Sequence, residues 1–112
     1  MDFQKKEINT IGIKMSAMEG SKEVGRAHLY LIYNDLHPGV PYGLLEDVFV
    51  DESQRGQGLG TKLVQAVMDE AKARNCYKLI ATSRHERGKV HELYEKLGFK
   101  DHGIEFRIDL PC

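Results

Sequence analysis

The chain has 112 residues, of which 41% are hydrophobic and 29% charged, and its formal net charge is -1. This length and balance are typical of a single globular domain spanning residues 1–112. The small net charge excludes bulk attraction to nucleic acid or to a membrane, and no apolar run approaches the ~20 residues that cross a bilayer. The N-terminus lacks the apolar stretch of a signal peptide, and Cys76 and Cys112 show neither metal-ligand nor redox spacing. We therefore expect a cytoplasmic protein with reduced thiols, no metal, and no nucleic-acid or membrane partner.

The pattern of the first half of the chain predicts three strands. Residues 8–18 alternate loosely, and turn residues separate them from 26–34, which are apolar on both faces and predict an interior strand. The two runs would form an antiparallel hairpin. A loop with two prolines, 35–43, leads to a third strand at 44–50.

The second half of the chain adds two helices. The first runs from about Leu59 to Arg74, and its apolar stripe is Leu59, Leu63, Val67 and Ala71, widened by Val64 and Met68. A strand at 77–83 follows, and the strand–helix–strand order predicts parallel pairing with 44–50. A second helix at 87–98 ends at Gly98, and 104–110 would close the chain as a strand or hairpin. The pattern predicts a mixed sheet with two helices, of the α/β or α+β class.

Three glycines, Gly56, Gly58 and Gly60, lie between the third strand and the first helix. Glycine allows positive φ and removes the Cβ atoms that would keep an anion from the amides at a helix N-terminus. The loop therefore predicts a diphosphate cradle, with Arg55 adding a charge-assisted hydrogen bond. A tight turn without a ligand is the alternative. The order of Thr61 and Lys62 fails the P-loop pattern, and the position of Thr61 fails the dinucleotide fingerprint.

Two motifs carry a family resemblance. The stretch LLEDVFVDESQRGQGLGTKLVQ resembles motif A of the GNAT superfamily of N-acetyltransferases, including its R/Q-x-x-G-x-G/A element, and ELYEKLGFK resembles the later tyrosine-bearing helix of that superfamily. Both occur in the family's order and spacing, over about residues 44–110. The resemblance implies a minimal GNAT fold in which acetyl-CoA lies where two parallel strands, 44–50 and 77–83, splay apart.

The resemblance also implies which residues would bind the co-substrate. Loop amides would hold its diphosphate, the backbone of the third strand would pair with the pantetheine arm, and Arg87 stands where many members carry a cofactor-contacting Asn. The residues are Val48, Phe49, Val50, Arg55, Gly56, Gln57, Gly58, Leu59, Gly60, Thr61 and Arg87.

The resemblance implies two catalytic residues. Tyr94 matches the tyrosine that protonates the departing thiolate. Glu46 and Asp47 are neighbours on a strand and would point to opposite faces, so only one would face the acceptor. The resemblance favours Glu46 as the group that accepts the amine proton, directly or through water, and Asp47 and His85 are rivals. Thr82 stands where some protein-acetylating members carry Glu, which leaves this base assignment open.

These features predict transfer of acetyl from acetyl-CoA to a primary amine of a small molecule or peptide, by direct attack. Residues 1–54 contain more Asp and Glu than Lys and Arg, and this acidic first half favours a cationic acceptor. The alternative is a non-catalytic acyl-CoA-binding sensor or subunit. Typical members begin with a strand and two helices that wall the acceptor site. Since this chain starts directly at the hairpin, the acceptor pocket would be open or completed by another subunit. We favour a homodimer, with loop 35–43 as the wall within the chain.

Overall fold

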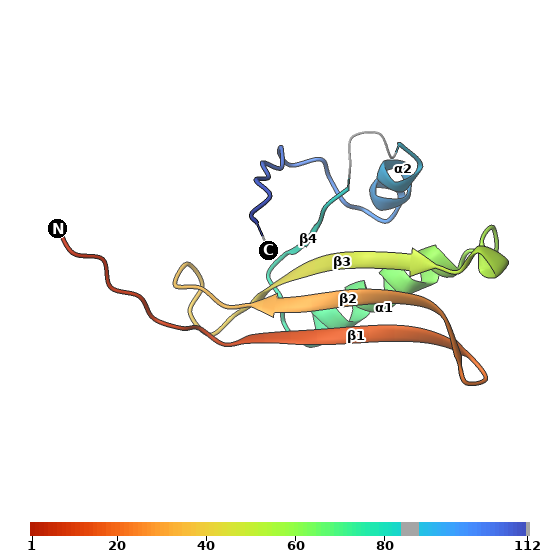
Figure 1. The fold of residues 1–112 in the computed structure, drawn as a ribbon, viewed down its shortest axis with the longest axis horizontal. Coiled ribbons are helices and arrows are strands. Elements are labelled where there is room, and N and C mark those ends of the chain that lie inside the picture. Colours follow the sequence, from red (N-terminus) through yellow and green to blue (C-terminus); the bar gives the residue numbers. More distant parts are fainter. Residues whose placement is uncertain (84–87, 112) are drawn as a thin grey trace. The chain divides into compact units, whose positions relative to one another are not determined.

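The structure, a computed structural model, describes residues 1–83 and 88–111. Its elements are β1 (Thr10–Glu19), β2 (Lys22–Ile32), β3 (Tyr42–Val50), the 3-10 helix η1 (Glu52–Gln54), α1 (Leu59–Ala73), β4 (Leu79–Ala81) and α2 (Gly88–Lys96) (Figure 1). The strands form one sheet in the order β1-β2-β3-β4, and only the β3–β4 pair is parallel. This mixed sheet with two helices is the predicted α+β arrangement. The chain divides into two compact units, 1–81 and 82–112, and each is described by itself.

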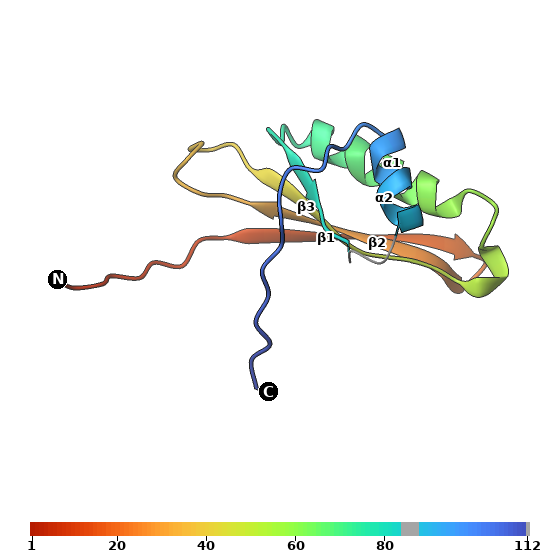
Figure 2. The same cartoon turned by 90° about the horizontal axis from the view of Figure 1, so that it is seen from above.

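The first unit is a sheet covered on one face by α1. Figure 2 shows α1 running along one side of the sheet. Alternate residues of β2 and β3 face the helix, because side chains of a strand point to opposite faces in turn. The predicted stripe of α1 supplies the other half of this core. Among the described residues, the buried apolar ones are Val24, Ala27, Leu29, Leu31, Leu45, Leu63, Val64, Val67 and Ala71.

Close packing of α1 on the sheet explains one glycine. A Cβ atom on Gly25 would lie 3.0 Å from Leu63 Cδ1 and 3.2 Å from Leu59 Cδ2. Such distances are tighter than ordinary van der Waals contact, so a side chain at residue 25 would require these leucine side chains to shift, and it would also lie 3.2 Å from the Phe49 carbonyl oxygen. The position of α1 in turn fixes where its N-terminus emerges beside the end of β3.

Each helix is followed by a left-handed residue, as the sequence predicts for α2 at Gly98. After α1, Asn75 has φ 61°, and the Cys76 N–H donates to the Ala71 carbonyl at 3.0 Å. After α2, Gly98 has φ 99°, and the Phe99 N–H donates to the Tyr94 carbonyl at 2.9 Å. Each bond satisfies a carbonyl that the helix end would otherwise leave unpaired. In the part of the chain that the structure describes, neither helix is both long and apolar enough to span a bilayer.

The C-terminal prediction is wrong. Residues 99–111 contain no strand, and the alternating apolar side chains of this segment are exposed: Ile104, Phe106, Ile108 and Leu110. A strand requires a neighbour whose backbone accepts and donates its hydrogen bonds, and an alternating pattern does not provide that neighbour. The other predicted elements are present, with bounds shifted by a few residues.

Candidate functional site

The glycine loop joins β3 to α1 with two residues in the left-handed region. Gly56 has φ 81° and Gly58 has φ 78°, which L-residues with a side chain rarely adopt. A Cβ atom at either position would meet nothing within 4 Å, so both glycines border open space. Conformation therefore requires these two glycines. Any side chain there would also project into the space in front of the loop.

Gly60 differs from the other two. It lies inside α1, its φ is not positive, and a Cβ there would lie 3.7 Å from Val50 Cγ2, an ordinary contact. Neither strain nor crowding within the protein demands a glycine at this position. The sequence pattern does not distinguish the three glycines. In the structure, Gly56 and Gly58 have a left-handed backbone and Gly60 does not.

The start of α1 has no side-chain cap. Gly58 is the N-cap and makes no side-chain hydrogen bond, and the first helical bond runs from the Lys62 N–H to the Gly58 carbonyl at 3.1 Å. Within residues 1–83 and 88–111, no protein acceptor is found for the amides of 56–61. Unpaired amides at a helix N-terminus carry partial positive charge and attract anions. The geometry fits an anion such as a diphosphate.

Arg55 lies at the entrance of the loop. Its Nε donates to the Val50 carbonyl at 3.1 Å. The Asp51 N–H, in the same peptide unit as that carbonyl, donates to Val24 on β2 at 2.8 Å, so the Val50 carbonyl points away from β2. Arg55 is thereby held at the free edge of β3. Its remaining guanidinium N–H groups are available to an anion.

The parallel strands separate at the middle of β3. The last pair of the β3–β4 ladder is Leu45 with Ala81, whereas β3 continues to Val50. Beyond Leu45 this edge of β3 has no β4 partner in the described chain. The residues predicted to pair with pantetheine, Val48, Phe49 and Val50, lie on this stretch.

Asp47 interrupts the regular pleat of β3. Its φ is 51°, and the β2–β3 register shifts between Arg26, which faces Phe49, and His28, which faces Glu46. This is a β-bulge, in which one strand carries an extra residue. The prediction that Glu46 and Asp47 point to opposite faces is therefore wrong, because the bulge breaks the alternation on which it rests.

Both carboxylates lie on the sheet face opposite α1. Glu46 lies across from His28 in register, and the Asp47 carboxylate contacts Arg26, two residues along the same face of β2. Arg26 Nε donates to Asp47 Oδ2 at 2.9 Å, and Nη2 donates to Oδ1 at 3.2 Å. Hydrogen bonding by Arg26 holds the pKa of Asp47 below its ordinary value.

The two carboxylates are therefore chemically different. Asp47 is bound by a guanidinium, and its lowered pKa makes it a weaker proton acceptor. Glu46 is exposed and has no hydrogen bond or ion pair in the described part of the chain. Of the two, Glu46 has the carboxylate that no other group of the described chain binds.

Arg26 and His28 are the residues of this face that the sequence interpretation missed. His28 Nδ1 is buried and lies 3.4 Å from Asp47 Oδ2, but its geometry is not that of a hydrogen bond. The contact is thus electrostatic and depends on protonation of the imidazole. Only the bulge brings Asp47 to these side chains, and the alternating sequence of β3 contains no signal for it.

Tyr94 lies on α2, in the second unit. Its ring centroid is 5.3 Å from that of Phe99, the residue whose N–H closes the helix end. This contact between the last turn and the residue after Gly98 is common at such helix ends. The local structure fixes the tyrosine on α2, and its catalytic role stays a prediction from the sequence motif. Two other predicted residues, His85 and Arg87, lie outside the described residues.

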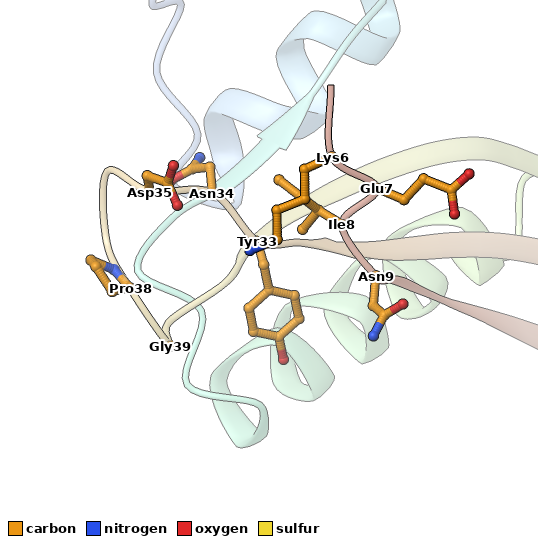
Figure 3. A pocket seen from close by; sticks show the side chains of 9 residues that line it. All are labelled: Lys6, Glu7, Ile8, Asn9, Tyr33, Asn34, Asp35, Pro38 and Gly39. Carbon is orange, nitrogen blue, oxygen red and sulfur yellow. The ribbon is translucent and has the colours of Figure 1, made fainter. Parts of the chain in front are cut away.

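Loop 35–43 packs at the other end of β3. The His37 ring centroid lies 3.9 Å from that of Tyr77, and the Tyr77 N–H donates to the Pro41 carbonyl at 3.1 Å. The loop and the segment before β1 border a groove of about 460 Å³, seen in Figure 3. Its polar lining includes Glu7 and Asp35. Since β3 begins here and the glycine loop follows its far end, the groove and the loop are separate features.

The comparisons with known proteins agree with this geometry. The model of the acetyltransferase (GNAT) family matches residues 4–99. A glucosamine 6-phosphate N-acetyltransferase of Trypanosoma brucei brucei is 39% identical over 87 residues, covering 78% of this chain and 57% of that protein. A thialysine N-epsilon-acetyltransferase of Sus scrofa is 32% identical over 83 residues, covering 74% and 48%. The chain thus spans about half the length of the curated relatives it matches.

Solved structures show the same fold. A Trypanosoma brucei acetyltransferase superimposes with a TM-score of 0.79 and 33% identity, over 88% of this chain and 69% of that chain. Glucosamine-6-phosphate N-acetyltransferase from Arabidopsis thaliana gives 0.78 and 29%, over 89% and 67%. With the family match, the glycine loop and the separated parallel strands, the chain belongs to the acetyltransferase (GNAT) family.

Proposed function

We propose that this chain transfers an acetyl group from acetyl-CoA, the co-substrate of GNAT acetyltransferases, to a primary amine. The observation that carries the proposal is the loop of Gly56 and Gly58, whose left-handed backbone and unpaired neighbouring amides border open space. It lies at the end of the β3 edge that β4 leaves uncovered. A diphosphate and an extended amide-containing arm are the two ligand parts that these features fit.

The co-substrate would bind along these two features. Amides of residues 55–61 would hold the diphosphate, and Arg55 would add a charge-assisted hydrogen bond. The backbone of Val48, Phe49 and Val50 would pair with pantetheine as an added strand. Arg87 would make a further contact, as the family motif implies. This binding would bring the thioester toward the bulge at Asp47.

The reaction would be direct attack of the amine on the thioester carbonyl. A C–N bond forms, the C–S bond breaks, and the leaving thiolate takes a proton from Tyr94. Before attack, the cationic amine loses one proton to Glu46, directly or through a water molecule; the second proton, which the nitrogen loses after the C–N bond forms, restores Tyr94. Glu46 is preferred over Asp47 because Arg26 already binds the Asp47 carboxylate.

The acceptor would be a small molecule or peptide that carries a primary amine. The relatives are named for glucosamine 6-phosphate, thialysine, and methionine sulfoximine or sulfone. The exposed Glu46 and the acidic first half of the sequence favour an acceptor that is cationic before reaction. A cytoplasmic location remains a prediction from the sequence.

We further propose self-association through the C-terminal segment. The side chains of Ile104, Phe106, Ile108 and Leu110 are 71–92% exposed and occur at every second position. This spacing places them on one face of an extended strand. Residues of this kind favour pairing with a second copy, which would make the homodimer predicted from the sequence.

Thiol release from acetyl-CoA, measured against an amine panel, tests the proposed activity. The panel contains glucosamine 6-phosphate, thialysine, methionine sulfoximine and a polyamine. We expect acetylation of at least one amine, and a decrease in kcat of about tenfold or more in Tyr94→Phe, the range of one lost proton donor. Tyr77→Phe is the matched control, because the Tyr77 hydroxyl has no hydrogen-bond partner in the described chain. Coenzyme A binding without thiol release for any amine would favour the non-catalytic sensor instead.

A further inference from the structure

The bulge at Asp47 is a disfavoured backbone conformation, which needs stabilising contacts from neighbouring side chains. A left-handed backbone at a residue with a side chain is disfavoured, although aspartate tolerates it better than most. Regular pairing resumes on either side, where Glu46 faces His28 and Phe49 faces Arg26. A strand without outside support would relax this local strain. Side chains on β2 are the nearest source of such support.

Arg26 contacts β3 on both sides of the irregularity. Its guanidinium donates two hydrogen bonds to the Asp47 carboxylate, at 2.9 and 3.2 Å. The same group lies over the Phe49 ring, with Cζ 4.6 Å from the ring centroid. A planar guanidinium binds a carboxylate in two places and stacks on an aromatic face, which a lysine cannot reproduce. One side chain of β2 therefore bridges the residues that define the bulge.

The position of the bulge links it to the reaction. The β3–β4 ladder ends at Leu45, and Glu46 follows immediately. The bulge turns Asp47 onto the face of Glu46 and so fixes the direction in which Glu46 and the uncovered edge of β3 are presented. A change in the pleat at Asp47 would therefore move both Glu46 and the uncovered edge of β3.

We infer that Arg26 is a positioning residue for acetyl transfer, which holds the Asp47 bulge and thereby orients Glu46 and the free edge of β3. This inference rests on the proposed acetyltransferase function. Arg26 would not touch the co-substrate. Its ion pair with Asp47 is partly exposed, with side-chain exposures of 32% and 52%, so it contributes little to global stability. Positioning therefore predicts a loss in turnover that exceeds the loss in stability.

Arg26→Ala and a rescue variant test the inference. We expect Arg26→Ala to lower kcat by about tenfold or more and to raise KM for acetyl-CoA by a smaller factor, because the free edge of β3 shifts while the diphosphate loop stays in place. Asp47→Gly accepts the left-handed backbone without help, so the double variant Arg26→Ala/Asp47→Gly should regain most of the lost kcat. Arg74→Ala is the matched control, since it removes another arginine–carboxylate pair, Arg74 with Glu70 at 2.8 Å.

Three kinetic outcomes would overturn the inference. They are an unchanged kcat in Arg26→Ala, a loss of kcat that Asp47→Gly fails to restore, and a rise confined to the KM of the acceptor. The last would indicate direct contact between Arg26 and the acceptor.

Hydrogen exchange separates this inference from the proposed function. Arg26→Ala should speed amide exchange across residues 46–50 several-fold, and Arg74→Ala should not. This measurement needs no turnover, so it tests whether Arg26 holds the bulge even if no amine on the panel is acetylated. Unchanged amide exchange in Arg26→Ala would refute the inference that Arg26 holds the Asp47 bulge. The absence of thiol release alone would count only against the proposed activity.

Discussion

At the scale of single residues, Asp47 determines the arrangement of the candidate site. At Asp47 the left-handed backbone accommodates one extra residue in β3. The bulge places the Asp47 carboxylate on the face opposite α1, whereas strict alternation would place it on the α1 face. Glu46 and Asp47 then share one face but differ in environment, because Arg26 binds only Asp47. The sequence of β3 contains no glycine at this point to suggest a bulge. Arg26 could not be recognised either, because its partner depends on that bulge.

Acid titration tests the ion pair between Arg26 and Asp47. The pKa of Asp47 lies below its ordinary value of 3.8, chiefly because Arg26 donates to it. A depressed carboxyl pKa stabilises the fold above the ordinary value, and this stabilisation is lost as the pH falls through the folded pKa. Asp47→Asn should therefore melt slightly below the natural protein at pH 7, and the difference should shrink below the ordinary value and vanish once the pH is below the folded pKa. A difference in melting temperature that stays constant down to strong acid would contradict the pairing.

At the scale of elements, the sequence predicts what local chemistry determines. The stripe of α1 and the glycine after α2 correctly identify a buried helix face and a helix end. Residues 26–34 correctly predict an interior strand, since β2 lies between β1 and β3, although only the face with Ala27, Leu29 and Leu31 is fully buried. These features depend on periodicity and on single-residue backbone preferences, which a sequence displays directly.

Features that depend on a second segment were not predicted. The alternating residues 104–110 indicate a strand, but the described chain offers them no partner. The three loop glycines look equivalent, yet only Gly56 and Gly58 occupy the left-handed region. The groove between loop 35–43 and the segment before β1 also depends on packing between distant residues. Such outcomes follow from tertiary contacts, which override local patterns.

At the scale of the whole molecule, the exposed C-terminal residues predict concentration-dependent association. Phe106 is 92% exposed and lies in the middle of the alternating segment. Phe106→Glu should weaken association by placing a charge among the apolar side chains, as sedimentation velocity at several concentrations would show. Phe3→Glu is the control, because Phe3 is 94% exposed but lies in the N-terminal segment. A monomer at every concentration, or equal effects of both variants, would refute this prediction.

The proposed chemistry depends on the loop amides binding a diphosphate, and titration calorimetry with coenzyme A measures that binding. We expect one coenzyme A to bind per chain, and Gly58→Val to weaken binding by about tenfold or more, since its side chain enters the open space and opposes φ 78°. Gly20→Val is the matched control, because Gly20 has φ 63° and open space but lies in the β1–β2 turn. It should bind coenzyme A as the natural protein does. No binding by the natural protein, or equal binding by Gly58→Val, would contradict the account.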